Sequence, residues 1–348
     1  MATSRGGGPA IGIVGTGAIG SSIAADLTDA GHDVTMIDQW PAHVEKMRAD
    51  GLRVTMPDLD LHVQVNANHI CDLASIKPMF DIVIVCVKSY DTKWAVQLIE
   101  PFLAADGVLV GIQNSMNDDA HGDIVGRHRT IGCAIELSAD VYEPGIVTRN
   151  TTRQGTWLTV GELDGTVTDR VEMIADLLTA VARTEVSTNI YGSKWTKLVA
   201  NSMVMGPFGL FGIRNWEACR LPGMREISVM LGKESVAVGK AMGYELEPVF
   251  GLSAEDFSGD TDDVLRKAMD TLNEHVGEHA VTAVVQDQRK GRRSEFRHIT
   301  GLVASTGAQV GVETPVNSAV VEIYEEIDSG ETEMSPENLD RLKSMIRW

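Results

Sequence analysis

The chain has 348 residues, which at roughly 150 residues per domain suggests two domains, each large enough to bury its own core. Lys and Arg number 30 against 49 Asp and Glu, and the resulting net charge of −19 argues against a nucleic-acid or anionic-membrane partner, because both attract positive surfaces. The composition, 43% hydrophobic and 23% charged, excludes a largely disordered chain. No apolar run approaches the ~20 residues of a membrane span, and the first residues lack the apolar stretch of a secretory signal, so we expect a cytoplasmic protein.

The first half of the chain alternates short β-branched runs with helical patterns. We expect strands at residues 10–14, 34–38, 81–87, 108–112, 130–137 and 156–160. Strands separated by helices of this length are typical of βαβ units and a parallel sheet.

From about Thr166 onward, helical periodicity dominates. We expect helices at residues 171–181, 194–205, 224–242, 262–278, 281–306 and 318–327, with Gly243 and Gly307 as helix ends and a loop at 245–260. The sequence therefore predicts an α/β domain at 1–180 and an all-α domain at 181–348.

A glycine-rich motif follows the first expected strand and opens a helix. Gly15 permits a tight turn, Gly17 lets a diphosphate approach the backbone, and Gly20 lets helix and strand pack closely. The residues between them, Ala18 and Ile19, begin the helix, whose N-terminus offers unpaired N–H groups to phosphates. The motif predicts a dinucleotide site, although a glycine-rich turn without a ligand stays an alternative.

Asp38 ends the second expected strand, 18 positions after Gly20. A carboxylate there can accept hydrogen bonds from the adenosine ribose hydroxyls, whereas a 2′-phosphate would meet a like charge. We therefore expect NAD as cofactor, with NADP as second choice. A purely local role for Asp38, as the cap of a turn, also stays open.

Six motifs in order resemble those of the ketopantoate reductase (2-dehydropantoate 2-reductase) family. They are the glycine motif, Val87-Lys88 after the third strand, Gln113-Asn114, Pro144-Gly145-Ile-Val, Trp195-Thr-Lys197-Leu-Val-Ala-Asn201, and Gln286-Asp287 with Glu295. The resemblance covers most of the chain. It implies an N-terminal Rossmann dinucleotide-binding domain and a helical C-terminal domain of the ketopantoate reductase / 6-phosphogluconate dehydrogenase type.

The chemistry of hydride transfer points to Lys197. A carbonyl that receives hydride develops negative charge on oxygen, which an ammonium can stabilise and protonate. Lys197 is therefore the candidate general acid and, in oxidation, the base, provided that burial lowers its pKa. Asn201 lies one helical turn away and can orient the substrate, while Asn114 can bridge substrate and nicotinamide ribose.

Further roles follow only from the resemblance. It implies that Lys88 lies near the cofactor and that Glu295 binds a substrate hydroxyl from a helix. For Glu295, membership of an ion-pair network with the neighbouring arginines is the alternative. Independently of the resemblance, Lys194 is expected to be the exposed lysine of its helix, because Trp195 and Leu198 define the buried side.

The chain departs from the family pattern at four positions. Ala283 and Met205 stand where the family has a serine and a second asparagine, Ser115 stands where it has glycine, and Asp38 disagrees with its usual NADPH preference. Loss of polar contacts indicates a less polar pocket, so we favour a 2-oxo acid or hydroxy compound other than ketopantoate.

These observations predict an NAD(P)-dependent oxidoreductase that transfers hydride between nicotinamide and a small, carboxylated carbonyl or alcohol substrate. The alternatives are a β-hydroxyacid dehydrogenase-like enzyme and a non-catalytic NAD(H) sensor. The widely spaced cysteines predict no metal site, and a homodimer is possible.

Overall fold

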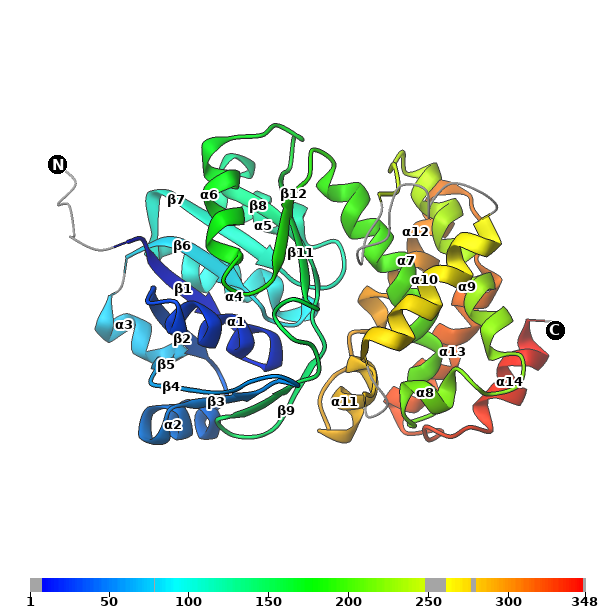
Figure 1. Ribbon diagram of the computed structural model, residues 1–348. Coiled ribbons are helices and arrows are strands. Elements are labelled where there is room, and N and C mark those ends of the chain that lie inside the picture. The colour runs from blue at the N-terminus through cyan, green and yellow to red at the C-terminus, as the bar shows by residue number, and fades with distance from the viewer. Residues whose placement is uncertain (1–7, 78, 248–260, 277–279, 347–348) are drawn as a thin grey trace. The chain divides into compact units, whose positions relative to one another are not determined.

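The computed structural model describes residues 8–77, 79–247, 261–276 and 280–346 (Figure 1). It divides into two compact units. The first contains the chain up to Ile190 except Asn114–Met116, and the second contains that short segment together with Tyr191–Trp348. The first unit thus extends beyond the boundary expected near 180, because residues 183–186 form a strand of its sheet.

The first unit is built on an eight-stranded sheet with the order β12-β11-β8-β7-β6-β1-β2-β5. Its strands are β1 (Ala10–Val14), β2 (Asp33–Asp38), β5 (Asn66–His69), β6 (Phe80–Val85), β7 (Leu103–Ile112), β8 (Thr130–Glu136), β11 (Trp157–Glu162) and β12 (Arg183–Val186). All neighbours are parallel except β8 and β11. The chain moves from β1 outward to β2 and β5, then returns to the other side of β1 at β6. This reversal of direction is where open α/β sheets bind ligands.

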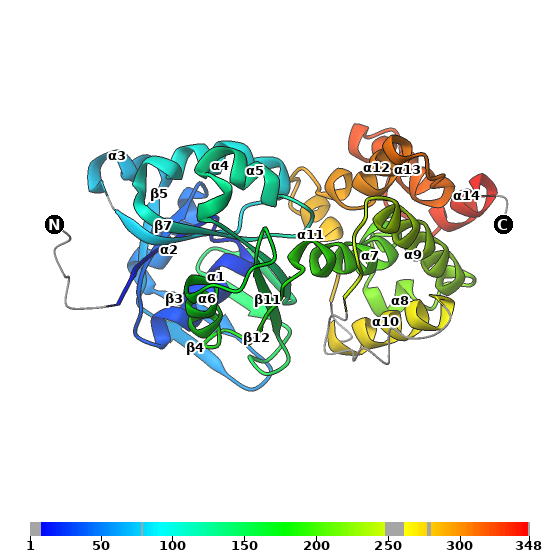
Figure 2. The same cartoon turned by 90° about the horizontal axis from the view of Figure 1, so that it is seen from above.

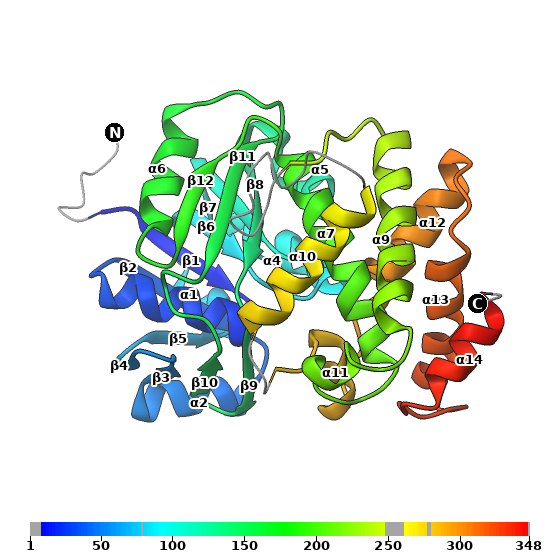
Figure 3. The same cartoon turned by 45° about the vertical axis from the view of Figure 1, so that its right-hand side comes forward.

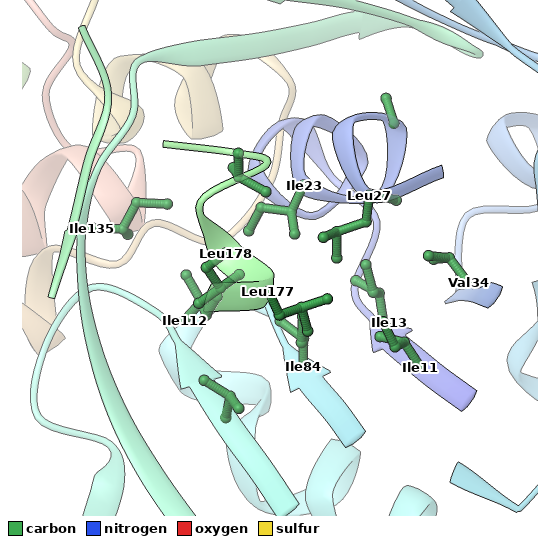
Figure 4. Packing of buried hydrophobic residues seen from close by; sticks show 14 of the residues in the cluster. Ile11, Ile13, Ile23, Leu27, Val34, Ile84, Ile112, Ile135, Leu177 and Leu178 are labelled. Carbon is green, nitrogen blue, oxygen red and sulfur yellow. The ribbon is translucent and has the colours of Figure 1, made fainter. Parts of the chain in front are cut away.

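Helices cover both faces of this sheet (Figure 2). They are α1 (Ala18–Asp29), α2 (Pro41–Asp50), α3 (Leu73–Ile76), α4 (Thr92–Ile99), α5 (Asp118–Val125) and α6 (Asp169–Leu178), with short 3-10 turns at Ile70–Asp72, Ser89–Asp91, Glu100–Phe102 and Arg127–Arg129. Alternate residues of β6 enter different cores. Ile82 and Ile84 belong to the core that includes residues of α1 and α6, and Figure 4 shows Ile84 in it. Val83 and Val85 belong to the core that includes residues of α4 and α5. The predicted parallel sheet is confirmed, and its central strands are buried on both faces.

A second, four-stranded sheet was not predicted. It has the order β4-β3-β10-β9, from β3 (Leu52–Thr55), β4 (Asp60–Val63), β9 (Ala139–Glu143) and β10 (Ile146–Arg149). Its strands are too short, and too mixed in polarity, for a clear sequence pattern. Fully buried Arg149 pairs with Asp26 of α1 at 2.6 Å, and Arg153 pairs with the same carboxylate at 2.7 Å. This ion pair ties the small sheet to α1.

The second unit is helical (Figure 3). Its helices are α7 (Ile190–Gly209), α8 (Asn215–Ala218), α9 (Met224–Ala241), α10 (Thr261–Val276), α11 (Ala283–Arg289), α12 (Thr300–Val310), α13 (Pro315–Ser329) and α14 (Asn338–Met345), with a 3-10 turn at Phe296–His298. Helix α7 is buried along nearly its whole length, and α9 packs against α10, α12 and α13. Among the described residues, no helix is long and apolar enough to cross a bilayer.

The expectation of a single helix over 281–306 is wrong. Helix α11 ends at Arg289, Gly291 adopts a left-handed φ of +61°, and α12 starts only at Thr300. Gly307 does not end a helix either. It lies inside α12, where a Cβ would come within 2.8 Å of Thr314 Cγ2, and the helix ends before Gly311 at φ +74°. The expected loop at 245–260 lies largely outside the described residues, which stop at 247 and resume at 261.

Candidate active site

The three glycines of the motif differ in what surrounds them. At Gly15, where φ is +86°, a Cβ would lie 2.6 Å from Val87 Cγ1, and at Gly20 it would lie 2.2 Å from the Gly15 carbonyl oxygen. At Gly17 no described atom beyond its two chain neighbours lies within 4 Å of the position of a Cβ. The first and third glycines are therefore required by packing, whereas the second leaves open space in front of the turn.

The N-terminus of α1 has no side chain that caps its backbone N–H groups. The helix begins at Ala18 after Gly17, with no side-chain cap and no acidic residue in its first turn. Its leading N–H groups, those of Ala18, Ile19 and Gly20, and the positive end of its dipole suit a diphosphate. The described residues thus fit the dinucleotide that the sequence predicts here.

Asp38 is held against the glycine turn. Its Oδ2 accepts hydrogen bonds from the Thr16 N–H at 2.6 Å and the Thr16 hydroxyl at 3.1 Å, and its Oδ1 accepts one from the Trp40 N–H at 2.7 Å. The capping role left open for Asp38 is therefore present. A carboxylate offers about four acceptor positions, so Oδ1 retains capacity for a ribose hydroxyl.

A network around Gln113 was missed by sequence reasoning. The Gln113 amide donates to the Val87 carbonyl at 2.7 Å and to the Thr92 hydroxyl at 3.0 Å, and its Oε1 pairs with His121 Nε2 at 2.8 Å. Buried Gln113 thereby fixes the loop that carries half-buried Lys88 to the end of β7. The Gln113-Asn114 motif marked this residue in the sequence, but the sequence did not show which residues Gln113 contacts.

Two predicted site residues, 87 positions apart in the sequence, meet in the second unit. The Asn201 side-chain amide donates to Asn114 Oδ1 at 3.1 Å. Lys197 lies one turn earlier on α7 with only 9% of its surface exposed, and this burial lowers the pKa of its amine to about 7. The predicted condition for acid–base chemistry at Lys197 is present.

Contacts with α9 fix the rotation of α7. The Trp195 indole donates to the Ser235 carbonyl at 2.9 Å, and the Ser202 and Ser235 hydroxyls are 2.7 Å apart. The expectation that Lys194 is exposed is wrong, since only 2% of it is accessible. Because α7 is enclosed on all sides, Trp195 does not mark a single buried face.

Glu295 is buried in the second unit but does not lie on a helix. It stands at the bend before the 3-10 turn, and its carbonyl accepts from the His298 N–H at 2.8 Å. Burial lowers the pKa of His298, and the Glu295 charge opposes that effect. Neighbouring Arg297 forms ion pairs with Glu325 and Asp328 of α13. The substrate role of Glu295 stays a prediction, as does its ion-pair alternative.

Comparison with known proteins identifies the family. The family model described as Ketopantoate reductase PanE/ApbA matches residues 11–165, and the one described as Ketopantoate reductase PanE/ApbA C terminal matches residues 189–328. The chain belongs to the ketopantoate reductase family. A curated 2-dehydropantoate 2-reductase from Archaeoglobus fulgidus is 26% identical over 324 residues, which cover 91% of this chain and 97% of the relative.

Solved structures show the same fold. A PanE/ApbA family ketopantoate reductase from Ralstonia eutropha JMP134 aligns with a TM-score of 0.77 at 24% identity, covering 92% of this chain and 98% of the other. D-Mandelate dehydrogenase with NADH and anilino(oxo)acetate aligns with a TM-score of 0.80 at 19% identity, with the same coverage. The predicted Rossmann domain followed by a helical domain is confirmed. The protein is an oxidoreductase that acts on a CH–OH group.

Proposed function

We propose that this ketopantoate reductase family member interconverts a small 2-oxo acid and its 2-hydroxy acid with NAD(H), and that Lys197 moves the proton. The observation that carries the proposal is the buried amine of Lys197, with a pKa of about 7, one helical turn from Asn201, which is hydrogen-bonded to Asn114. The nicotinamide, when bound, supplies or accepts the hydride.

The proton step follows from the chemistry of the carbonyl. When hydride reaches the carbon, the oxygen takes up the electron pair of the former double bond, and the Lys197 ammonium gives it a proton and becomes neutral. In the opposite direction the neutral amine removes the hydroxyl proton as hydride leaves. A pKa near the working pH populates both forms of the amine, which suits it to either direction. Asn201 and Asn114 orient the substrate oxygen, and Glu295 is proposed to bind a substrate hydroxyl.

The preference for NAD rests on Asp38. Its carboxylate is buried against the glycine turn by Thr16 and Trp40, so a 2′-phosphate would meet a negative charge that cannot swing away. D-Mandelate dehydrogenase, which shares the fold, has been solved with NADH, so the fold accommodates that cofactor. Lys88 is proposed to contact the cofactor from the loop after β6.

The substrate is proposed to differ from 2-dehydropantoate. Met205 and Ala283 are both partly accessible and provide no hydrogen-bonding side chain where the family pattern has asparagine and serine. Thr282, next to Ala283, caps α11 by accepting from the Val285 N–H at 3.3 Å. A substrate with less polar surface at these positions is therefore favoured, because an unpaired polar group there would cost on the order of 1–3 kcal/mol.

A screen by nicotinamide absorbance tests the proposal. Wild-type protein is assayed with 2-dehydropantoate and other 2-oxo acids, and in reverse with 2-hydroxy acids including D-mandelate, each with both cofactors. Turnover of a 2-oxo acid with NADH preferred over NADPH is expected. Absence of turnover with every acid and both cofactors would favour the NAD(H) sensor instead, and preference for a 3-hydroxy acid would favour a β-hydroxyacid dehydrogenase.

Lys197→Ala separates catalysis from binding. It is expected to lose most turnover while NADH binding, followed by nicotinamide fluorescence, is unchanged. Lys240→Ala, at an exposed lysine near the end of α9, is the matched control and should keep full activity. A cytoplasmic location and a homodimer complete the proposal, and light scattering of the purified protein tests the second.

A further inference from the structure

We propose that the Ser115 hydroxyl binds the carboxylate of the substrate and thereby helps set which 2-oxo acid this enzyme accepts. The proposal rests on the proposed function, because it assumes a carboxylated substrate beside Asn114 and Asn201. It goes further in assigning a residue outside the Lys-Asn-Glu set.

Ser115 has a backbone conformation that residues other than glycine rarely adopt. Its φ is +73°, in the left-handed region where the Cβ of an L-residue is crowded by the backbone. Among the described residues, Lys77 is the other non-glycine with positive φ, and it lies exposed at the end of α3. Ser115 is buried, and the family pattern has glycine at this position, which would adopt the same conformation without strain. Strain of this kind is retained chiefly at functional sites.

No hydrogen bond within the described part of the chain compensates for this strain at Ser115. It makes no hydrogen bond with any residue in the described part of the chain, although only 6% of Ser115 is exposed. The hydroxyl oxygen itself is not fully buried, so a ligand can reach it. Glycine would relieve the backbone strain, so a ligand that accepts a hydrogen bond from this hydroxyl accounts for a serine here.

The place of Ser115 in the chain indicates which ligand. It directly follows Asn114, whose Oδ1 accepts from Asn201, and the segment Asn114–Met116 belongs to the same compact unit as Lys197. Ser115 is therefore the chain neighbour of a residue proposed to orient the reacting carbonyl. In a 2-oxo acid the carboxylate is bonded to that carbonyl carbon, and its oxygens are strong acceptors for an O–H donor. A hydroxyl beside Asn114 fits this group.

Two substitutions test whether Ser115 contacts the substrate or is a functionally neutral replacement of glycine. Ser115→Ala removes the hydroxyl and keeps the strained backbone, whereas Ser115→Gly removes both. Each is expected to lower kcat/KM for the best 2-oxo acid of the screen by about tenfold, through a higher KM, with NADH binding unchanged. Only Ser115→Gly should raise the melting temperature. Lys77→Gly is the matched control, since it relieves left-handed strain at an exposed site and should leave kcat/KM unchanged.

The methyl ester of the same acid tests the carboxylate directly. With the ester, wild-type protein and Ser115→Ala should differ by less than about twofold, because the charged acceptor is gone. An equal loss with acid and ester would overturn the assignment to the carboxylate. A stabilised Ser115→Gly with undiminished kcat/KM would show that the serine has no substrate role, while leaving the proposed function intact. If wild type turns over no 2-oxo acid with either cofactor, the proposed function itself is wrong.

Discussion

The pH dependence of catalysis provides the sharpest test of the role of Lys197. Burial lowers the pKa of its amine from 10.5 to about 7. At pH 7 an ordinary lysine is neutral in about one molecule in 3,000, whereas an amine with a pKa of about 7 is neutral in about one half. Burial thus increases the population of the base form by on the order of a thousandfold.

The two directions of the reaction should respond oppositely to pH. Reduction needs the ammonium, so its kcat/KM should fall as the pH rises through about 7, and oxidation needs the neutral amine, so its kcat/KM should rise over the same interval. Initial rates are measured by nicotinamide absorbance from pH about 5 to about 10. Lys197→Ala should lose the inflection, and added methylamine should restore part of the rate. Parallel profiles in both directions, or an inflection unchanged in Lys197→Ala, would refute the reasoning.

The same burial affects stability, with a sign that can be checked. The pKa of Lys197 is lower in the folded than in the unfolded chain, so between pH about 7 and 10.5 the unfolded state binds more protons and stability rises with pH. The full difference is on the order of 5 kcal/mol, an upper bound because the folded chain can relax around the charge. Lys197→Met should therefore be more stable than wild type at pH about 6, and the difference should shrink towards pH about 10. Urea unfolding at several pH values measures it, and a difference independent of pH would contradict the assigned burial.

Three further predictions address the first unit. Gly17→Ala should fold normally but weaken NADH binding on the order of tenfold, because its Cβ enters the open space proposed for the diphosphate. Gly20→Ala should instead lower the melting temperature, because its Cβ would lie 2.2 Å from a carbonyl oxygen. Asp38→Ser should raise the ratio of NADPH to NADH efficiency by about tenfold or more, since it removes the charge facing a 2′-phosphate; an unchanged ratio would dissociate Asp38 from cofactor choice. Asp26→Asn should destabilise the fold by about 3–5 kcal/mol in urea unfolding because it leaves Arg149 buried without its counter-charge; a loss below about 1 kcal/mol would show that the buried pair adds little.

Local pattern was enough to predict the central strands of the first unit. Strands such as β6 are apolar runs, which a sheet covered on both faces requires, and the glycine motif is informative only between a strand and a helix. Both features act over a few residues, so neighbouring sequence determines them. The edge strands β5 and β12 are largely polar and were not predicted. The small second sheet escaped prediction because each of its strands is too short to show a pattern by itself. Its two antiparallel pairs, β3 with β4 and β9 with β10, are local, but the parallel alignment of Ile146 with Arg53 that joins them links residues far apart in the sequence.

The contacts that form the candidate site could not be predicted from hydrophobic periodicity. The spacing of Lys197 and Asn201 predicted one helical face, but a helix buried on every side has no single apolar stripe, and the expectation for Lys194 failed for that reason. The rotation of α7 is set instead by the bond from Trp195 to Ser235, 40 positions away in the sequence. At Ser115 the sequence showed a replaced glycine, and only the backbone showed that the replacement retains a glycine conformation. Where the chain keeps such a costly arrangement, conflict between local preference and structure is itself the indication of a site.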